Sequence, residues 1–218
     1  MHVVRVLALL MLAALLLTAC SKEPKPQAES RQAEPKPAAE QPRIPTESPI
    51  PEITVAERPK HNNIVIAADS GDVQAVMWFL QNGHPVGEAE RYGYTALHRA
   101  AARGHNDLVR YLLYKGADPN QLNDDGFIAL HNAAMGGDST TVRVLIDAGA
   151  LIYARDDNGM APIHLSAMKN NFSSAKGLIA AGANVNDMNE NQWTPMRVAQ
   201  RYEFSEFVEF LRQHGAEK

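Results

Sequence analysis

The chain of 218 residues is poor in the residue types that carry redox, metal or nucleic-acid chemistry. It has one cysteine, which excludes an internal disulfide and any metal site that needs several thiolates. Its 21 Lys and Arg are outnumbered by 25 Asp and Glu, and the formal net charge is −4. Nucleic acid is therefore not an expected partner, because binding to phosphates requires clustered cations. Hydrophobic residues make up 45% of the chain, which is enough to build a sizeable core.

The first twenty residues have the layout of a targeting segment. An unbroken apolar run covers residues 6–17 and is too short to span a bilayer of about 30 Å as a helix. The run leads into Leu17-Thr18-Ala19-Cys20, which resembles the lipobox of bacterial lipoproteins. An ordinary signal peptide with a coincidental cysteine is the alternative interpretation.

The lipobox resemblance implies that residues 1–19 are a lipoprotein signal peptide and that Cys20 becomes the acylated first residue of the mature protein. Fatty acids such as palmitate on this residue would anchor the protein, since several acyl chains give durable membrane attachment. Ser21 follows the cysteine, and the resemblance implies sorting to the outer membrane. We therefore expect a membrane partner through a lipid anchor, with the protein facing the periplasm.

Residues 20–60 are expected to form a disordered linker that begins at the lipidated cysteine. The stretch 21–60 holds nine of the thirteen prolines, none of the fourteen glycines, and seven acidic and seven basic residues. Its apolar residues are too scattered to bury, which favours an extended, proline-rich tether. We interpret it as a spacer that holds the folded part away from the membrane.

Residues 61–218 repeat with a period of 33 residues. Four aligned segments begin, without a gap, at Thr95, Ile128, Ala161 and Thr194. A Gly-Ala pair follows the same step and begins at residues 116, 149, 182 and 215. A constant step of this size is typical of a solenoid, in which each repeat buries its apolar faces against its neighbours.

The second copy, GYTALHRAAARGHNDLVRYLLYKGADPN over residues 93–120, resembles the ankyrin repeat. The resemblance covers residues 61–218 and implies an all-α ankyrin-repeat solenoid. Each repeat would be a helix–turn–helix followed by a β-hairpin or finger loop. The five expected repeats cover residues 61–90, 91–123, 124–156, 157–189 and 190–218.

The residues of one repeat indicate how it folds. Thr95 can cap the first helix, His98 can reach back to that cap, and Gly104 can supply the left-handed turn between the two helices. The fourth copy departs from this pattern, because Ala161 cannot cap and Gly177 stands inside the second helix. Each change costs roughly 1 kcal/mol. We therefore predict that the fourth repeat is the least stable.

Three histidines recur at the 33-residue step, His98, His131 and His164, a pattern that could suggest a metal site. Stacked helices lie about 8–10 Å apart, whereas zinc requires ligand nitrogens at about 2 Å. We expect each histidine to bond within its own helix start, and we predict no metal and no cofactor. The nucleophile-elbow, phosphate-loop, dinucleotide-binding and His-Glu-x-x-His patterns are missing from the sequence. The chain is therefore predicted not to be an enzyme and to have no small-molecule substrate.

The candidate site is a protein-binding surface. In ankyrin arrays the finger tips and first helices form the concave binding face, which the resemblance implies here. The residue before each aligned segment is large and apolar, and stacking would place these four side chains in one ladder. Aromatic, Met and Arg residues on this face are the types enriched at binding hot spots. The candidate residues are Arg91, Tyr92, Tyr94, Arg103, Phe127, Met135, Met160, Met168, Lys169, Trp193, Arg201 and Tyr202.

The sequence therefore predicts a membrane-anchored interaction module of the bacterial cell envelope that binds a protein partner on the concave ankyrin face. Two other roles stay open. One is an immunity protein that neutralises an envelope-targeted toxin or effector enzyme. The other is a support factor for a periplasmic enzyme or for an oxidative-stress response.

Overall fold

The structure is a computed structural model that describes residues 47–51 and 57–217. The expected signal peptide, Cys20 and most of the linker lie outside the described residues. The described residues belong to one compact unit. Among the described residues, no helix is long and apolar enough to cross a membrane.

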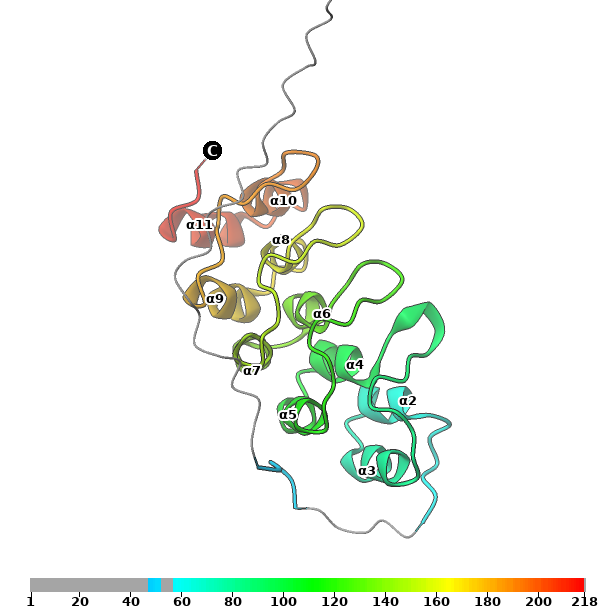
Figure 1. Ribbon diagram of the computed structural model, residues 1–218. Helices are drawn as coiled ribbons and strands as arrows, with labels where there is room; N and C mark the ends of the chain where they lie inside the picture. The colour runs from blue at the N-terminus through cyan, green and yellow to red at the C-terminus, as the bar shows by residue number, and fades with distance from the viewer. Residues whose placement is uncertain (1–46, 52–56, 218) are drawn as a thin grey trace, which may run out of the picture. The chain divides into compact units, whose positions relative to one another are not determined.

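The described part of this unit is all-helical, as the sequence predicts (Figure 1). A 3-10 turn, η1 (Arg91–Gly93), precedes the second pair of helices. The α-helices are α2 (Ile64–Asp69), α3 (Val73–Gln81), α4 (Ala96–Arg103), α5 (Asn106–Tyr114), α6 (Ala129–Gly136), α7 (Ser139–Asp147), α8 (Pro162–Met168), α9 (Phe172–Ala180), α10 (Pro195–Arg201) and α11 (Ser205–Gln213).

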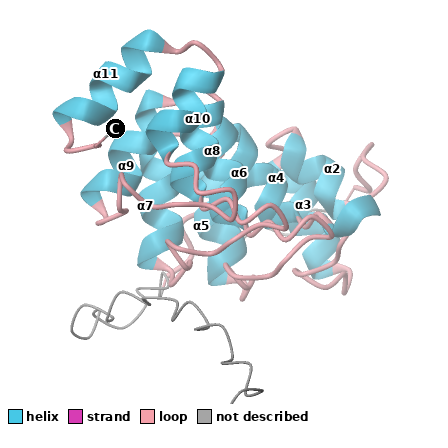
Figure 2. Cartoon of the chain, turned by 90° about the horizontal axis from the view of Figure 1, so that it is seen from above, coloured by secondary structure: helices cyan, strands magenta, loops and turns pink. Residues whose placement is uncertain are grey.

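The helices form two layers, with the first helix of each pair in one layer and the second helix in the other (Figure 1). The inner layer contains α2, α4, α6, α8 and α10, and the outer layer contains α3, α5, α7, α9 and α11. Finger loops project from the inner layer on one side of the stack, as Figures 1 and 2 show. We call the inner helices and the fingers together the inner face, which is the face expected to be concave.

The finger loops are turns rather than paired strands in the described residues, where only an isolated antiparallel bridge joins Ala89 and Thr95. A backbone hydrogen bond closes each finger, as when the Asn123 N–H donates to the Phe127 carbonyl at 2.9 Å. The same bond recurs from Asp156 to Met160 at 3.1 Å. The fingers therefore keep the expected hairpin path with very little ladder pairing.

The helix start of the second repeat has the predicted geometry. Thr95 is the N-cap of α4, its side chain accepts from the His98 N–H, and the Thr95 N–H donates to His98 Nδ1 at 3.3 Å. Two of the N–H groups that have no partner within the helix are thereby satisfied. Gly104 ends α4 in the left-handed region with φ 70°, which confirms its predicted role. In the fourth copy the corresponding residue, Asn170, adopts φ 54°.

The core lies between the two layers. The apolar side chains of α5 from Leu108 to Leu113 are buried, and Tyr111 is buried among them. Ala100 and Ala101 on the inner helix α4 are fully buried in the same hydrophobic cluster. Small residues on the inner helices let neighbouring repeats approach closely, so the core is continuous from repeat to repeat.

Candidate protein-binding face

A buried amide or carboxylate shapes each of three fingers. Oδ1 of Asn123 accepts from the N–H groups of Asp125 at 3.0 Å and Phe127 at 2.8 Å. Asp156 and Asn189 stand at the equivalent positions, one and two repeats on, and make the same pair of bonds. This amide or carboxylate therefore fixes the conformation of its finger tip. It also fixes the position of the residue four places later, which is Phe127, Met160 or Trp193.

The recurrent histidines join each repeat to the next. His98 Nδ1 accepts from the backbone of its own helix start, as predicted, and Nε2 donates to the Phe127 carbonyl of the following finger at 3.0 Å. His131 Nε2 donates in the same way to the carbonyls of Ala154 and Met160, at 3.1 and 3.2 Å. The second contact was not predicted, because the acceptor lies a whole repeat away in the sequence.

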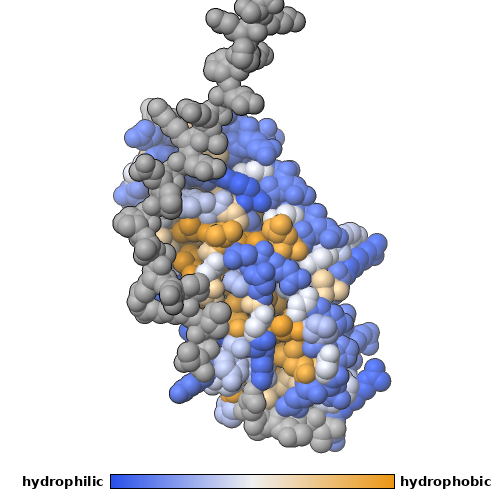
Figure 3. Space-filling model, in the orientation of Figure 1, coloured by the Kyte–Doolittle hydropathy of each residue, from blue (hydrophilic) through white to orange (hydrophobic). Residues whose placement is uncertain are grey.

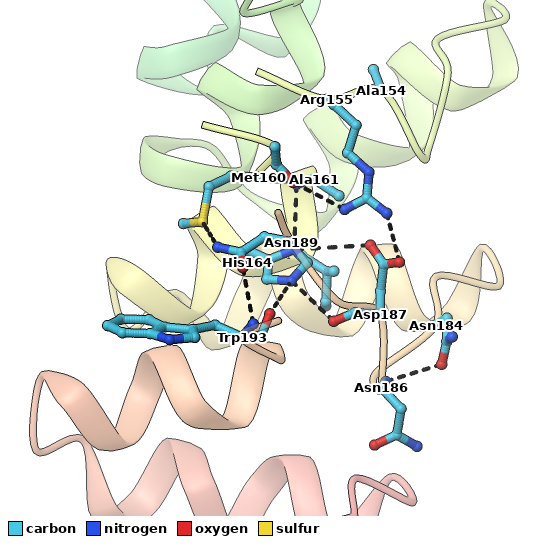
Figure 4. A network of polar contacts seen from close by, with 12 residues as sticks. Ala154, Arg155, Met160, Ala161, His164, Asn184, Asn186, Asp187, Asn189 and Trp193 are labelled. Atoms are coloured by element: carbon cyan, nitrogen blue, oxygen red, sulfur yellow. Dashed lines mark hydrogen bonds and ion pairs between the residues drawn. The ribbon is translucent and has the colours of Figure 1, made fainter. Parts of the chain in front are cut away.

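Figure 4 shows the arrangement around the third histidine. His164 Nε2 lies 3.0 Å from the carbonyl oxygens of both Asp187 and Trp193. The Arg155 guanidinium pairs with the Asp187 carboxylate at 2.7 Å, which fixes the same finger from the other side. Both ring nitrogens of His164 are therefore engaged in holding protein backbone.

Burial lowers the pKa of His98, His131 and His164 from the ordinary value of 6.5. Carbonyl acceptors oppose this shift in all three, and the Asp187 carboxylate also opposes it at His164. Because Nδ1 accepts and Nε2 donates, the neutral ring with a proton on Nε2 is the form that fits. These histidines are structural links between repeats, and no group of three metal-ligating side chains occurs in the part of the chain that the structure describes.

The ladder comprises Tyr94, Phe127, Met160 and Trp193. All four side chains are half-buried, and each stands immediately before an inner helix. Two of the rings contact a side chain of their own repeat. Phe127 stacks on the His131 ring with centroids 5.4 Å apart, and the Arg99 guanidinium lies 4.2 Å from the Tyr94 ring centroid. Part of every ladder side chain stays accessible.

The other predicted residues divide by exposure. Met135 and Met168 are half-buried on the inner helices. Tyr92 and Tyr202 are 56% and 50% exposed, at a finger tip and at the end of α10. The predicted cations are exposed, and they are Arg91, Arg103, Lys169 and Arg201. On the face seen in Figure 3, hydrophilic residues cover the fingers and hydrophobic residues gather along the middle of the stack.

Two of these cations have partners within the chain. Arg103 makes two hydrogen bonds to the Asp69 carboxylate, at 3.0 and 3.1 Å. This contact raises the pKa of Arg103. The Arg91 guanidinium lies 5.0 Å from the Tyr92 ring centroid. Lys169 and Arg201 have no carboxylate within 4.0 Å among the described residues, so they remain available to a ligand.

One residue of this face was missed in the sequence. Arg197 lies with its guanidinium 5.4 Å from the Trp193 ring centroid and is exposed. It occupies the position that His98, His131 and His164 hold in earlier repeats, where the ring donates to the next finger. The described chain has no finger after the fifth repeat for that position to contact. The change from His to Arg was the signal that could have identified it.

The described site contains aromatic, methionine and cationic side chains on a rigid frame, which suits docking of another protein surface. A comparison with protein-family models matches the description "Ankyrin repeats (3 copies)" over residues 64–156 and 130–218. A search of curated proteins gives no match. The matched residues cover more than half of the chain and include every helix described above. The chain therefore belongs to the ankyrin repeat family, whose repeats form protein–protein interaction modules.

Proposed function

We propose that the chain is a lipid-anchored protein of the bacterial cell envelope whose ankyrin domain binds a protein partner on its inner face. The lipobox-like Leu17-Thr18-Ala19-Cys20 supports acylation at Cys20, and Ser21 supports the outer membrane, with the domain facing the periplasm. The proline-rich linker would let the domain reach a partner at some distance from the membrane.

The ladder is the observation that carries the binding proposal. Four large side chains, all half-buried, recur at one structural position, and the three aromatic ones each contact a side chain of their own repeat. Rigid aromatic groups lose little conformational freedom on binding, so they are efficient anchors. Their regular spacing suits one continuous partner surface that contacts several repeats at once.

The binding proposal is tested with Phe127→Ala and Trp193→Ala combined in the acylated, full-length protein. Affinity capture from the protein's own membranes should lose the partner that the wild type retains, while the far-UV circular dichroism signal stays nearly unchanged. Ile146→Ala with Ile179→Ala is the matched control, because these large apolar side chains are also half-buried but lie on the outer helices α7 and α9. Capture that survives loss of the ladder residues but fails in the control would place the site elsewhere.

The anchor is tested separately with Cys20→Ala. Metabolic labelling with an alkyne analogue of palmitate should mark the wild type and leave this variant unlabelled. Fractionation should then find the wild type with outer membranes. Equal labelling of both proteins would refute acylation at Cys20 without affecting the proposed binding face.

A further inference from the structure

The cations of the inner face differ between its two halves. In α4 of the second repeat, Arg99 pairs with Glu90 at 2.7 Å and Arg103 pairs with Asp69 at 3.0 Å. These charges are already satisfied by neighbouring parts of the chain. A charged ligand at this half would have to displace an internal partner, which lowers its gain on binding.

The carboxyl-terminal half carries cations with no such partner. Lys169, Arg197 and Arg201 are exposed, and no ion pair at 4.0 Å or less joins any of them to another described residue. Lys169 caps the end of α8, and Arg201 ends α10, so both also complement their helix dipoles. That role needs no further partner and leaves the charged groups open to solvent.

Aromatic rings lie near the cations of α10. Trp193, Arg197 and Arg201 follow one another at intervals of four residues, which places them along one side of α10 and its entry. The Arg197 guanidinium is 5.4 Å from the Trp193 ring centroid. Tyr202 stacks on Phe204 with centroids 6.0 Å apart and remains half exposed. Aromatic rings and unpaired positive charges thus occur together along α10, and Lys169 adds a third unpaired charge at the end of α8.

Two further unpaired cations lie on the outer layer and provide a comparison. Arg143 and Lys176 line a groove of about 550 Å³ between α7 and α9. Asp147 lines the same groove, which reduces its positive potential, and the lining residues include no aromatic ring. Unpaired cations beside aromatic rings are therefore found at α10 and not at this groove.

The fingers of the same half bear the opposite charge. Asp157 and Glu190 stand at equivalent finger-tip positions in the fourth and fifth repeats, and both are exposed. An acidic ligand would be repelled by the tips and attracted to the ends of the inner helices. The charge pattern thus favours one path along the inner face, close to Lys169 and Arg201.

We propose that the fourth and fifth repeats bind an acidic segment of the protein partner. This segment would be extended and would carry Asp or Glu side chains with an apolar side chain between them. Lys169, Arg197 and Arg201 would bind its carboxylates, and Trp193 and Tyr202 would contact its apolar group. The inference rests on the proposed function, since it gives the chemistry of the partner at the same face.

The test uses three fluorescein-labelled ten-residue peptides, in which Leu is flanked by Glu, by Gln or by Lys. Binding to the acylated, full-length protein in non-ionic detergent is measured by fluorescence anisotropy at two salt concentrations. The Glu peptide should bind about tenfold more tightly than the Gln peptide. That advantage should shrink as salt rises, because the added ions screen the charges.

Two double variants with equal charge change locate the site. Lys169→Gln with Arg201→Gln should weaken binding of the Glu peptide about tenfold, since two ligand contacts are removed. Arg143→Gln with Lys176→Gln removes the same charge from the outer layer and should change binding less than about twofold. A Glu peptide that binds no more tightly than the Gln peptide, or equal losses in the two variants, overturns the acidic-segment proposal.

The outcome is separable from that of the proposed function. If Phe127→Ala alone abolishes capture of the partner while the Glu peptide shows no preference, the inner face binds a protein but not through an acidic segment. If the Glu peptide binds as expected while the ladder variant still captures the partner, the charged patch is real and the ladder is not the anchor.

Discussion

Two neighbouring borders between repeats differ in which helix layer is most closely packed. Between the second and third repeats, Gly136 in α6 lies against α4 so closely that a Cβ there would overlap the Ala102 carbonyl oxygen. Between the third and fourth repeats the close approach is in the outer layer, where a Cβ at Gly177 would lie 3.1 Å from the Ser139 Cα. One border is thus tight at the inner face and the other at the outer face.

The hydrogen bonds between outer helices also differ between the two borders. At the first border the outer helices are joined by side chains alone, as when Thr141 Oγ1 donates to Asn106 Oδ1 at 2.7 Å. At the second border, side chains from the start of α9 reach the backbone of the third repeat. The Ser174 hydroxyl donates to the Ala133 carbonyl at 2.8 Å, and Asn171 Nδ2 donates to the Gly137 carbonyl at 3.0 Å.

The departures of the fourth repeat from the pattern affect two different interactions, the helix itself and the border with the third repeat. Ser174 and Gly177 depart from the repeat pattern and weaken α9 as an isolated helix. In the structure both lie at the border with the third repeat, one as a buried hydrogen-bond donor and the other as a point of close contact. A departure that is unfavourable within a repeat can therefore be favourable between repeats.

The largest expected effect comes from Gly136→Ala. The added methyl group would meet backbone that cannot move without separating α4 from α6, and overpacking of this kind costs about 2–3 kcal/mol. We expect the free energy of unfolding, obtained from urea titrations followed by fluorescence and circular dichroism, to fall by this amount.

Gly177→Ala is the matched substitution at the second border. Alanine gains roughly 1 kcal/mol in helix propensity, and crowding against α7 offsets it, because Val142 Cγ1 would lie at 3.2 Å. The net change in unfolding free energy should be under about 1 kcal/mol. Equal destabilisation by both substitutions would show that the two borders do not differ in the way described.

The free energy of unfolding should also depend on pH, because the histidines that join the repeats are buried. The folded-state pKa of His98, His131 and His164 is lowered, so the unfolded chain takes up protons first as the pH falls below about 6.5. Stability should be full above pH 7 and should decline from there toward the lowered folded-state pKa. Urea midpoints measured between pH 7.5 and 5 give the slope.

His131→Gln separates this effect from general acid destabilisation. Removing one of three such groups should reduce the pH-dependent loss by about a third. The variant should also be less stable at pH 7.5, since Nε2 bonds to the next repeat are lost. An unchanged slope would mean that other groups control the acid sensitivity.

Features that act within one repeat were predictable from the sequence. The bonds between Thr95 and His98 and the left-handed Gly104 depend on residues at most a few positions apart, so the spacing alone defines them. Contacts between repeats were not predictable in this way. The partner of Arg103 is Asp69, 34 residues earlier, and the constant period does not say which side chains meet across a border.

The candidate site shows the same limit. The period identified the ladder positions, but it could not give the half-burial of Phe127 or the internal pairing of Arg103. Both depend on side-chain geometry at the border between repeats. Arg197 was not predicted as a site residue. It stands at the position that His98, His131 and His164 occupy in the earlier repeats, and only that comparison shows that it is unusual.

A further small effect tests the weakness that remains inside the fourth repeat. Ala161 stands at the N-cap position of α8 and makes no side-chain bond there, although its N–H donates to His164 Nδ1 at 3.3 Å. Ala161→Ser supplies the missing hydroxyl and should stabilise the protein by up to about 1 kcal/mol. Thr95→Ala removes the equivalent group and should lose a similar amount. Hydrogen exchange should show α8 and α9 opening first in the wild type and gaining protection in Ala161→Ser. Opening that begins in another repeat would mean that the Ser174 and Asn171 bonds outweigh the missing cap, so that contacts across the border decide which repeat is weakest.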